Sequence, residues 1–78
     1  MHFESVGVFL MPGRGLVKTV VLGRDCDDFS WLVNQPVWVD DIPYTVSAVK
    51  YRGHDAPFKA DEIVGLLLKE LRSERGEP

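Results

Sequence analysis

The first residues whose types could do chemistry are two glycines followed by Lys18-Thr19, in Met11-Pro-Gly-Arg-Gly-Leu-Val-Lys-Thr19. A nucleotide-binding P-loop needs glycine directly before its lysine, because backbone N–H groups must wrap the phosphates there. Val17 occupies that position, and a β-branched residue does not readily adopt the positive φ that glycine permits. The segment is therefore predicted to be a turn between two strands, and no nucleotide is expected as a ligand.

A second chemical candidate is the acidic segment Asp25-Cys-Asp-Asp28. An EF-hand needs a central glycine and a closing glutamate in its loop, and neither follows at the required position. A zinc site would need further Cys or His ligands nearby, and the sequence has none there. Cys26 is also poorly suited as a nucleophile, since three neighbouring carboxylates disfavour its thiolate. We expect no metal and no cofactor.

The last catalytic candidate is His54-Asp55, as a base with its orienting carboxylate. Adjacent residues on an extended segment point in opposite directions, and no nucleophile can be identified to complete the set. The sequence therefore predicts that the protein is not an enzyme.

Composition narrows the class of protein and of partner. A chain of 78 residues suits one small domain, spanning residues 1–78. Nine Lys and Arg against twelve Asp and Glu give a formal charge of −3, which weighs against nucleic acid because phosphate binding rests on clustered cations. A single cysteine, with no visible signal peptide and no apolar run long enough to span a membrane, predicts a cytoplasmic protein without a membrane partner.

Short apolar runs separated by turn signals indicate the elements that must position any site. Strands are expected over residues 6–11, 16–22, 36–39, 44–51 and 63–68. Turns are expected at 12–13 and 40–43, and the connection 24–35 contains a buried-looking cluster of Phe29, Trp31 and Leu32 with room for one helical turn. A helix from Asp61 through Leu71 is the competing interpretation of the last run, but Gly65 and the adjoining β pattern favour a strand.

Five or six short strands in a chain of this length predict an all-β fold. The favoured architecture is a small closed antiparallel β-barrel, because closure removes exposed sheet edges. Its core should span about residues 3–69, and residues 70–78 are expected to be a flexible C-terminal tail.

Four blocks, in order, extend over nearly the whole chain: Phe9-Leu-Met-Pro-Gly-Arg-Gly-Leu-Val-Lys-Thr19, Asn34-Gln-Pro-Val-Trp-Val39, Ser47-Ala-Val-Lys-Tyr51 and Val64-Gly-Leu-Leu-Leu-Lys69. Together they resemble the β-barrel second domain of elongation factor Tu and related translational GTPases. In that family the first block contains Gly-Arg-Gly-Thr-Val-Val-Thr-Gly and the last is Val-Gly-Leu/Val-Leu-Leu-Arg. The resemblance implies a translation-factor domain-2-like barrel.

What the resemblance implies about ligands is narrower. The hydrolase chemistry of that family lies in a separate domain, whereas the second domain contacts the aminoacyl end of tRNA and, on the ribosome, rRNA. Phe9 matches the phenylalanine of the aminoacyl pocket, and Arg52 matches its arginine across a one-residue gap. The acidic pair of the pocket is replaced here by Val6 and Gly7, and its asparagine is replaced by Ile63.

The favoured function is a non-catalytic module that binds another protein. The alternative is an RNA- or ribosome-binding protein related to translation, for which Arg14, Lys50, Arg52 and Lys59 would supply the cations. With Lys18, these residues are interpreted either as a basic face or, preferably, as an ordinary solvated surface. Contacts are expected around the turn 12–15 and the loop 52–59, since loops on a rigid scaffold concentrate binding residues. The predicted binding residues are Arg14, Lys50, Arg52 and His54, with Phe9 and Tyr51 beneath them. The competing contact residue is Trp38, expected to point outward on the opposite hairpin.

Overall fold

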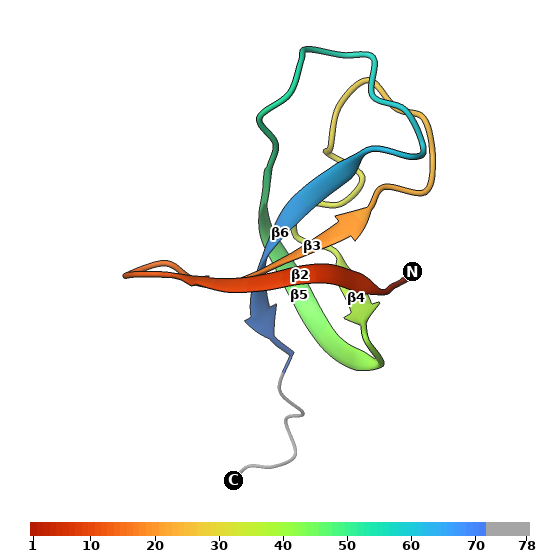
Figure 1. The fold of residues 1–78 in the computed structure, drawn as a ribbon. Coiled ribbons are helices and arrows are strands. Elements are labelled where there is room, and N and C mark those ends of the chain that lie inside the picture. Colours follow the sequence, from red (N-terminus) through yellow and green to blue (C-terminus); the bar gives the residue numbers. More distant parts are fainter. Residues whose placement is uncertain (72–78) are drawn as a thin grey trace, which may run out of the picture.

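Six strands form one sheet in the computed structural model, which describes residues 1–71 (Figure 1). The strands are β1 (His2–Phe3), β2 (Ser5–Met11), β3 (Gly15–Val21), β4 (Pro36–Val39), β5 (Ile42–Lys50) and β6 (Ile63–Glu70). The described residues contain no helix, so the all-β prediction is confirmed. β6 continues to Glu70, the first residue of the predicted tail, and residues 72–78 lie outside the described part of the chain.

The five predicted strands correspond to β2 through β6. The run from Val64 to Leu68 is buried at every residue, which explains its continuous apolar sequence and excludes the helix that competed for it. Within the connection 24–35, where one helical turn was predicted, the chain forms hydrogen-bonded turns. Leu32 is fully buried there, and Phe29 and Trp31 pack against the core. β1 was not predicted, because two residues carry too little pattern to indicate a strand.

The strand order is β1-β4-β5-β6-β3-β2, and every pairing is antiparallel except that of β1 with β4. Because this order does not return to β1, the strand pairings do not close the sheet into a barrel, and the closed barrel stays a prediction. The two end strands are nevertheless consecutive in the sequence, with only Glu4 between them. One continuous segment thus pairs with β4 through its first residues and with β3 through the rest.

The hairpin between β4 and β5 is set by two aspartates. Asp40 and Asp41 have φ values of 53° and 67°, and they form a two-residue loop between the paired residues Val39 and Ile42. Positive φ at both central residues matches the right-handed twist of the flanking strands, and aspartate tolerates this conformation better than most residues. The predicted turn is therefore present, and β5 begins two residues earlier than expected.

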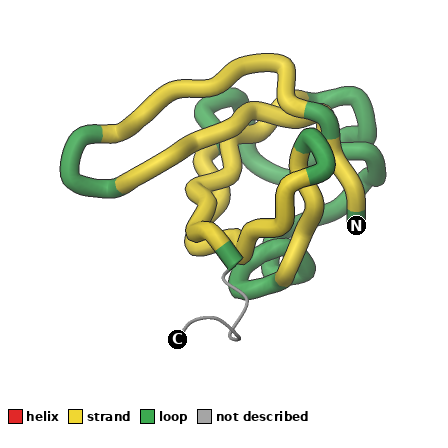
Figure 2. The backbone as a smooth tube through the Cα atoms, turned by 90° about the horizontal axis from the view of Figure 1, so that it is seen from below, coloured by secondary structure: helices red, strands yellow, loops and turns green. Residues whose placement is uncertain are grey.

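The core lies on the inner face of the curved sheet, whose backbone Figure 2 shows from below. Its fully buried side chains come from four strands and the connection between β3 and β4: Val20, Leu22, Leu32, Val37, Val39, Val46, Val64 and Leu66. The loop residues Phe29 and Phe58 stack at 4.5 Å between ring centroids. Burial of these apolar side chains is the main stabilising contribution to a domain of this size.

The glycine-rich segment is a strand connection, as predicted. The Arg14 N–H donates to the Met11 carbonyl at 2.9 Å, and Lys18-Thr19 lies in the middle of β3. Gly13 has φ +77°, and a Cβ built on it would meet no atom within 4 Å. The conformation, and not crowding, therefore requires glycine at this position.

Replacing Gly13 with valine should lower the free energy of unfolding by about 1–2 kcal/mol, because a β-branched residue is strained at positive φ. In a domain of this size that change lowers the melting temperature by roughly 4–15 °C. Gly13→Asn is the matched control, since asparagine tolerates the left-handed region. It should lower the free energy of unfolding clearly less than Gly13→Val does. A Gly13→Val protein that melts with the parent would contradict the assigned turn.

Candidate functional site

A row of small residues crosses the outer face of the sheet. Gly7 in β2 lies opposite Thr19 in β3, Thr19 lies opposite Gly65 in β6, and Gly65 lies opposite Lys50 in β5. Residues that oppose each other on neighbouring strands point to the same face, and their chain neighbours point to the other. Since Val64 and Leu66 belong to the core, this row faces away from it. Two of its four residues have no side chain: the Thr19 hydroxyl lies over Gly7, and the Val17 and Lys50 side chains pack beside Gly65.

Larger side chains border this row and turn it into a groove. The next row contains Phe9, opposite Val17, and the row on the other side contains Ile63, opposite Val21. The resulting hollow, here called the outer groove, holds about 340 Å³ and is lined by Phe9, Thr19, Lys50, Tyr51, Arg52, Gly53, Ile63, Val64 and Gly65. This volume is at the lower end of the range for small-molecule pockets.

The outer groove brings together four of the six predicted binding residues: Phe9, Lys50, Tyr51 and Arg52. His54 stands behind Tyr51, with ring centroids 5.6 Å apart in an edge-to-face arrangement. Arg14 is exposed at the β2–β3 turn and is not among the lining residues. The sequence analysis missed Thr19 and Gly65 as parts of the floor. Their signal was a glycine within a buried strand, which marks a close approach to the backbone.

Glu62 holds one end of the outer groove in place. Its carboxylate accepts a hydrogen bond from the Tyr51 hydroxyl and another from the Lys59 backbone N–H at 2.9 Å. Its Oε1 also lies 2.8 Å from Nε2 of His54. These contacts tie the loop 52–61 to the start of β6. Glu62 was not predicted, because its partners are spread along a loop and only the fold brings them together.

Charge and hydrogen bonding favour the ionised forms of Glu62 and His54. The hydrogen bond from Tyr51, followed by those from Lys59 and His54, lowers the pKa of Glu62. The Asp55 carbonyl, 2.6 Å from Nδ1 of His54, raises the pKa of that imidazole, and Glu62 adds to the effect. With an acceptor at each ring nitrogen, the geometry suits a doubly protonated imidazolium.

The Tyr51 ring also depends on a glycine. It packs edge-to-face against Phe58, with centroids 5.2 Å apart, while its hydroxyl is fixed by Glu62. A Cβ on Gly53 would overlap the Tyr51 hydroxyl and ring. Because packing and a hydrogen bond both hold the ring, it has little freedom to give way, and Gly53 is needed for the shape of the groove.

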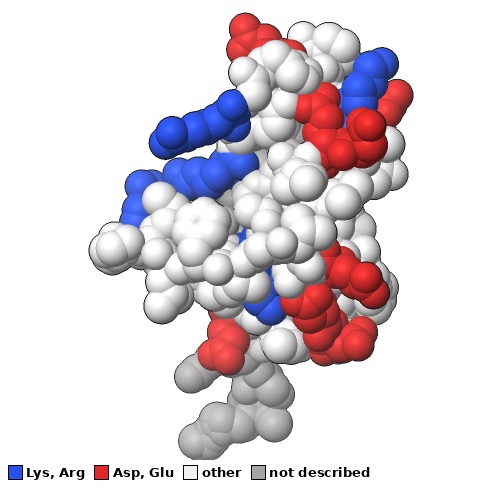
Figure 3. Space-filling view, in the orientation of Figure 1, with Lys and Arg blue, Asp and Glu red and all other residues white. Residues whose placement is uncertain are grey.

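The charges of this face are unevenly distributed. Figure 3 shows Lys and Arg side chains gathered mainly on the left of the view and most Asp and Glu side chains on the right and lower sides. Lys50 and Arg52 supply cations to the outer groove. Lys18, which the sequence assigned to a basic face, is instead buried, with only 10% of its side chain exposed. That part of the prediction was wrong, because Lys18 alternates with outward-facing residues on β3.

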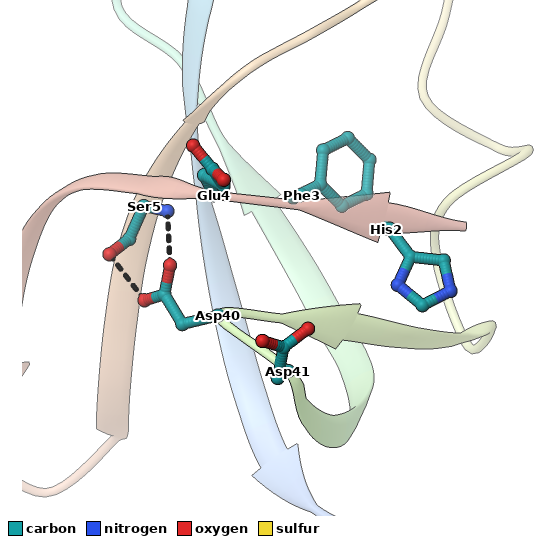
Figure 4. Close-up of a pocket in the computed structure, with 6 residues that line it drawn as sticks. All are labelled: His2, Phe3, Glu4, Ser5, Asp40 and Asp41. Carbon is teal, nitrogen blue, oxygen red and sulfur yellow. Dashed lines mark hydrogen bonds between the residues drawn. The ribbon is translucent and has the colours of Figure 1, made fainter.

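Lys18 belongs to a second polar cluster, here called the seam, which consists of Ser5, Lys18 and Asp40. The Asp40 carboxylate accepts hydrogen bonds from the Ser5 N–H at 2.8 Å and the Ser5 hydroxyl at 2.6 Å, as Figure 4 shows. It also accepts one from Nζ of Lys18 at 3.3 Å. The hydrogen bonds from Ser5, assisted by Lys18, lower the pKa of Asp40.

A larger hollow of about 530 Å³ adjoins the seam, lined by His2, Phe3, Glu4, Ser5, Asp40 and Asp41. Its Asp40 carboxylate is already occupied by three donors. Within residues 1–71, no group of three or more His, Cys, Asp or Glu side chains is arranged to hold a metal ion. Trp38, the competing contact residue, is 43% exposed as expected, and its ring stacks on His2 at 5.9 Å.

Comparison with protein-family models, with curated proteins and with solved structures found no match. The resemblance to the second domain of elongation factor Tu thus remains a prediction from the sequence. Over the described residues, no helix is long and apolar enough to cross a membrane. The outer groove is the candidate site, since it combines a formed hollow, exposed aromatic side chains and cations.

The Glu62 cluster predicts an elevated pKa for His54, above the ordinary value of about 6.5. Since the pKa in the folded state exceeds that in the unfolded state, the contribution of His54 to stability is complete below about pH 6.5 and is lost as the pH rises through the folded value. NMR titration of the ring protons measures this pKa. Glu62→Gln should lower it, whereas Tyr51→Phe, which leaves the carboxylate, should lower it less. An ordinary pKa that Glu62→Gln leaves unchanged would contradict the assigned contact.

The seam predicts a stability that depends on pH in the opposite sense. The pKa of Asp40 is lower in the folded protein, so its contribution is complete above the ordinary value of about 3.9 and is lost as the pH falls through the folded value. Asp40→Asn should therefore reduce the free energy of unfolding at pH 7, and the difference from the parent should narrow in acid. Asp41→Asn removes the same charge from the same turn and should change stability little. Equal effects of the two substitutions would rule out the seam as a specific stabilising contact.

Proposed function

We propose that this protein is a non-catalytic binding module that receives an extended segment of another protein in the outer groove. The observation that carries the proposal is the hollow of about 340 Å³ over Thr19 and Gly65, which is bordered by Phe9, Lys50 and Ile63. A sheet face without ligand or partner is normally covered by larger side chains. Here a hollow stays open over Thr19 and Gly65, beside aromatic and cationic residues.

The proposal includes a closed scaffold, in which the continuous segment of β1 and β2 completes a small barrel. Two observations support this part. The end strands of the sheet are separated only by Glu4, and Asp40 after β4 is hydrogen-bonded to Ser5 at the start of β2. Closure of this kind would leave few unpaired edges and would hold the strands of the groove in fixed register.

The chemistry of the lining favours a partner segment with apolar and acidic side chains. Phe9 and Ile63 are half exposed, so covering them with an apolar side chain is favourable by about 25 cal/mol for each Å² buried. Lys50 and Arg52 can pair with carboxylates at the rim, and arginine and tyrosine are the residue types that most often carry contact energy. An acidic peptide therefore fits both parts of the lining.

RNA is the alternative ligand, since Phe9 and Tyr51 could stack bases and the two cations could contact phosphates. The internal position of Lys18 removes one cation from the face that RNA would need. The net charge of −3 also opposes a polyanion. Both observations favour a protein segment over RNA. Substitution of Arg52 and Lys50 by alanine distinguishes the two ligands.

Selection of peptides from a random library on the immobilised protein tests the proposal. We expect selected peptides to be rich in carboxylates and apolar residues and to perturb the NMR signals of Thr19 and Gly65. Arg52→Ala and Lys50→Ala should each weaken binding by about 3–10-fold, the effect of a solvent-exposed rim charge, without lowering the melting temperature. Lys69→Ala is the matched control, because it removes an exposed cation from the same strand as Gly65.

Three results would overturn the proposal. The first is that no peptide is selected, and the second is binding that Arg52→Ala and Lys50→Ala leave unchanged. The third is tight, salt-sensitive binding of tRNA or rRNA fragments in a mobility-shift assay that the same two variants abolish, which would assign the groove to RNA.

A further inference from the structure

The free edge of β2 is the most apolar exposed feature of the described chain. β2 pairs with β3 along one side, and no other strand within residues 1–71 pairs with its other side. Four of its residues stay largely exposed: Val6 58%, Val8 56%, Phe9 50% and Leu10 73%. A strand edge of this kind presents unpaired backbone N–H and C=O groups, which readily pair with another strand.

Natural edge strands usually carry a device that prevents such pairing, such as a lysine, a proline or a bulge. The segment 6–11 contains no charged residue and no proline. The register irregularity of β2 lies between Ser5 and Gly7 and leaves the pairing from Gly7 to Met11 regular. The exposed edge is therefore unprotected over its apolar part, which is expected of a surface that is covered in the working protein.

The position of the edge makes it accessible to another chain. The hairpin of β2 and β3 projects beyond the rest of the sheet, with its turn at the far end, in both Figure 1 and Figure 2. Its tip is fixed by the Met11–Arg14 turn. A strand approaching β2 from outside thus meets no other element along residues 7–11.

The charges at the two ends of β2 indicate which strand fits there. Glu4 is exposed just before the strand, and Arg14 is exposed in the turn just after it. A second copy that runs antiparallel brings the Glu4 carboxylate of each copy toward the Arg14 guanidinium of the other. A parallel copy would bring like charges together, which is unfavourable.

We propose that the protein forms a symmetric dimer in which β2 pairs antiparallel with β2 of a second copy, centred on Phe9. In this register Val8 lies opposite Leu10 and Gly7 opposite Met11 of the second copy, so residues 7–11 of the two copies cover each other along their whole length. The contact is isologous, as most homodimer contacts are. Val6, Val8, Phe9 and Leu10 supply the apolar side chains of the contact, and the paired backbones supply its hydrogen bonds.

Sedimentation velocity over a range of protein concentrations tests the dimer. We expect a reversible monomer–dimer equilibrium that Leu10→Lys weakens at least tenfold, because it places a charge inside the apolar contact. Leu10 is the most exposed apolar residue of β2, so the substitution should leave the melting temperature of the monomer unchanged. Ile42→Lys is the matched control, an exposed apolar residue at the opposite hairpin, and should not affect association.

Orientation is tested by charge reversal and by cross-linking. Glu4→Arg and Arg14→Glu should each weaken the dimer, and the double variant should restore it. In a Cys26→Ser background, Phe9→Cys should form an intermolecular disulfide, since opposed residues of antiparallel strands lie within disulfide range. A protein that stays monomeric at millimolar concentration, a dimer that Leu10→Lys leaves intact, or a double variant that fails to restore association would overturn the proposal. None of these results depends on a ligand in the outer groove. Phe9 belongs to both sites, but Leu10 does not line the groove, so Leu10→Lys tests the dimer separately from the proposed function.

Discussion

The structure depends on one polar contact between the two ends of its sheet. Asp40, in the turn after β4, accepts two hydrogen bonds from Ser5 at the start of β2 and a third from the buried Lys18 ammonium of β3. Burial alone would lower the pKa of Lys18. Its interactions with the Tyr44 side chain, over whose ring the ammonium lies, and with the Asp40 carboxylate raise the pKa above its ordinary value. A buried ammonium needs such partners, because an unpaired charge is strongly unfavourable away from water. The seam therefore satisfies an internal cation and joins distant strands with the same carboxylate.

The seam determines where the candidate site can form. It fixes the start of β2, and the register of β2 on β3 then sets Gly7 opposite Thr19 and Phe9 opposite Val17. The row of small residues continues into β6 and β5 only because each strand keeps its register. At the other end, Glu62 holds Tyr51 and the loop that carries Arg52 and His54. Two carboxylates, each with three donors, thus stabilise opposite parts of one scaffold, and the outer groove lies between them.

Local sequence patterns were enough to predict most strands but not their closure or their contacts. The turns at Gly13 and at Asp40-Asp41 follow from residues that accept positive φ, and the buried run of β6 follows from its continuous apolar sequence. Phe9, Lys50, Tyr51 and Arg52 were predicted as binding residues and line one groove. The roles of Lys18 and Glu62 could not be predicted, because they depend on partners 22 and 11 residues away along the chain. Thr19 and Gly65 became part of a floor only through strand register, which one sequence without pairing information does not specify.

Amide hydrogen exchange at the seam and along the adjoining pairing of β1 with β4 tests this account most directly. The Ser5 N–H bonds to Asp40, the Trp38 N–H to the Met1 carbonyl and the Asp40 N–H to the Phe3 carbonyl, at 2.8, 2.9 and 3.0 Å. If these contacts hold the sheet as one cooperative unit, the three amides should exchange only through global unfolding, as slowly as those at the centre of β3 and β6. Fast exchange of the three amides, with β3 and β6 still protected, would show that the sheet opens at the seam and would contradict the account.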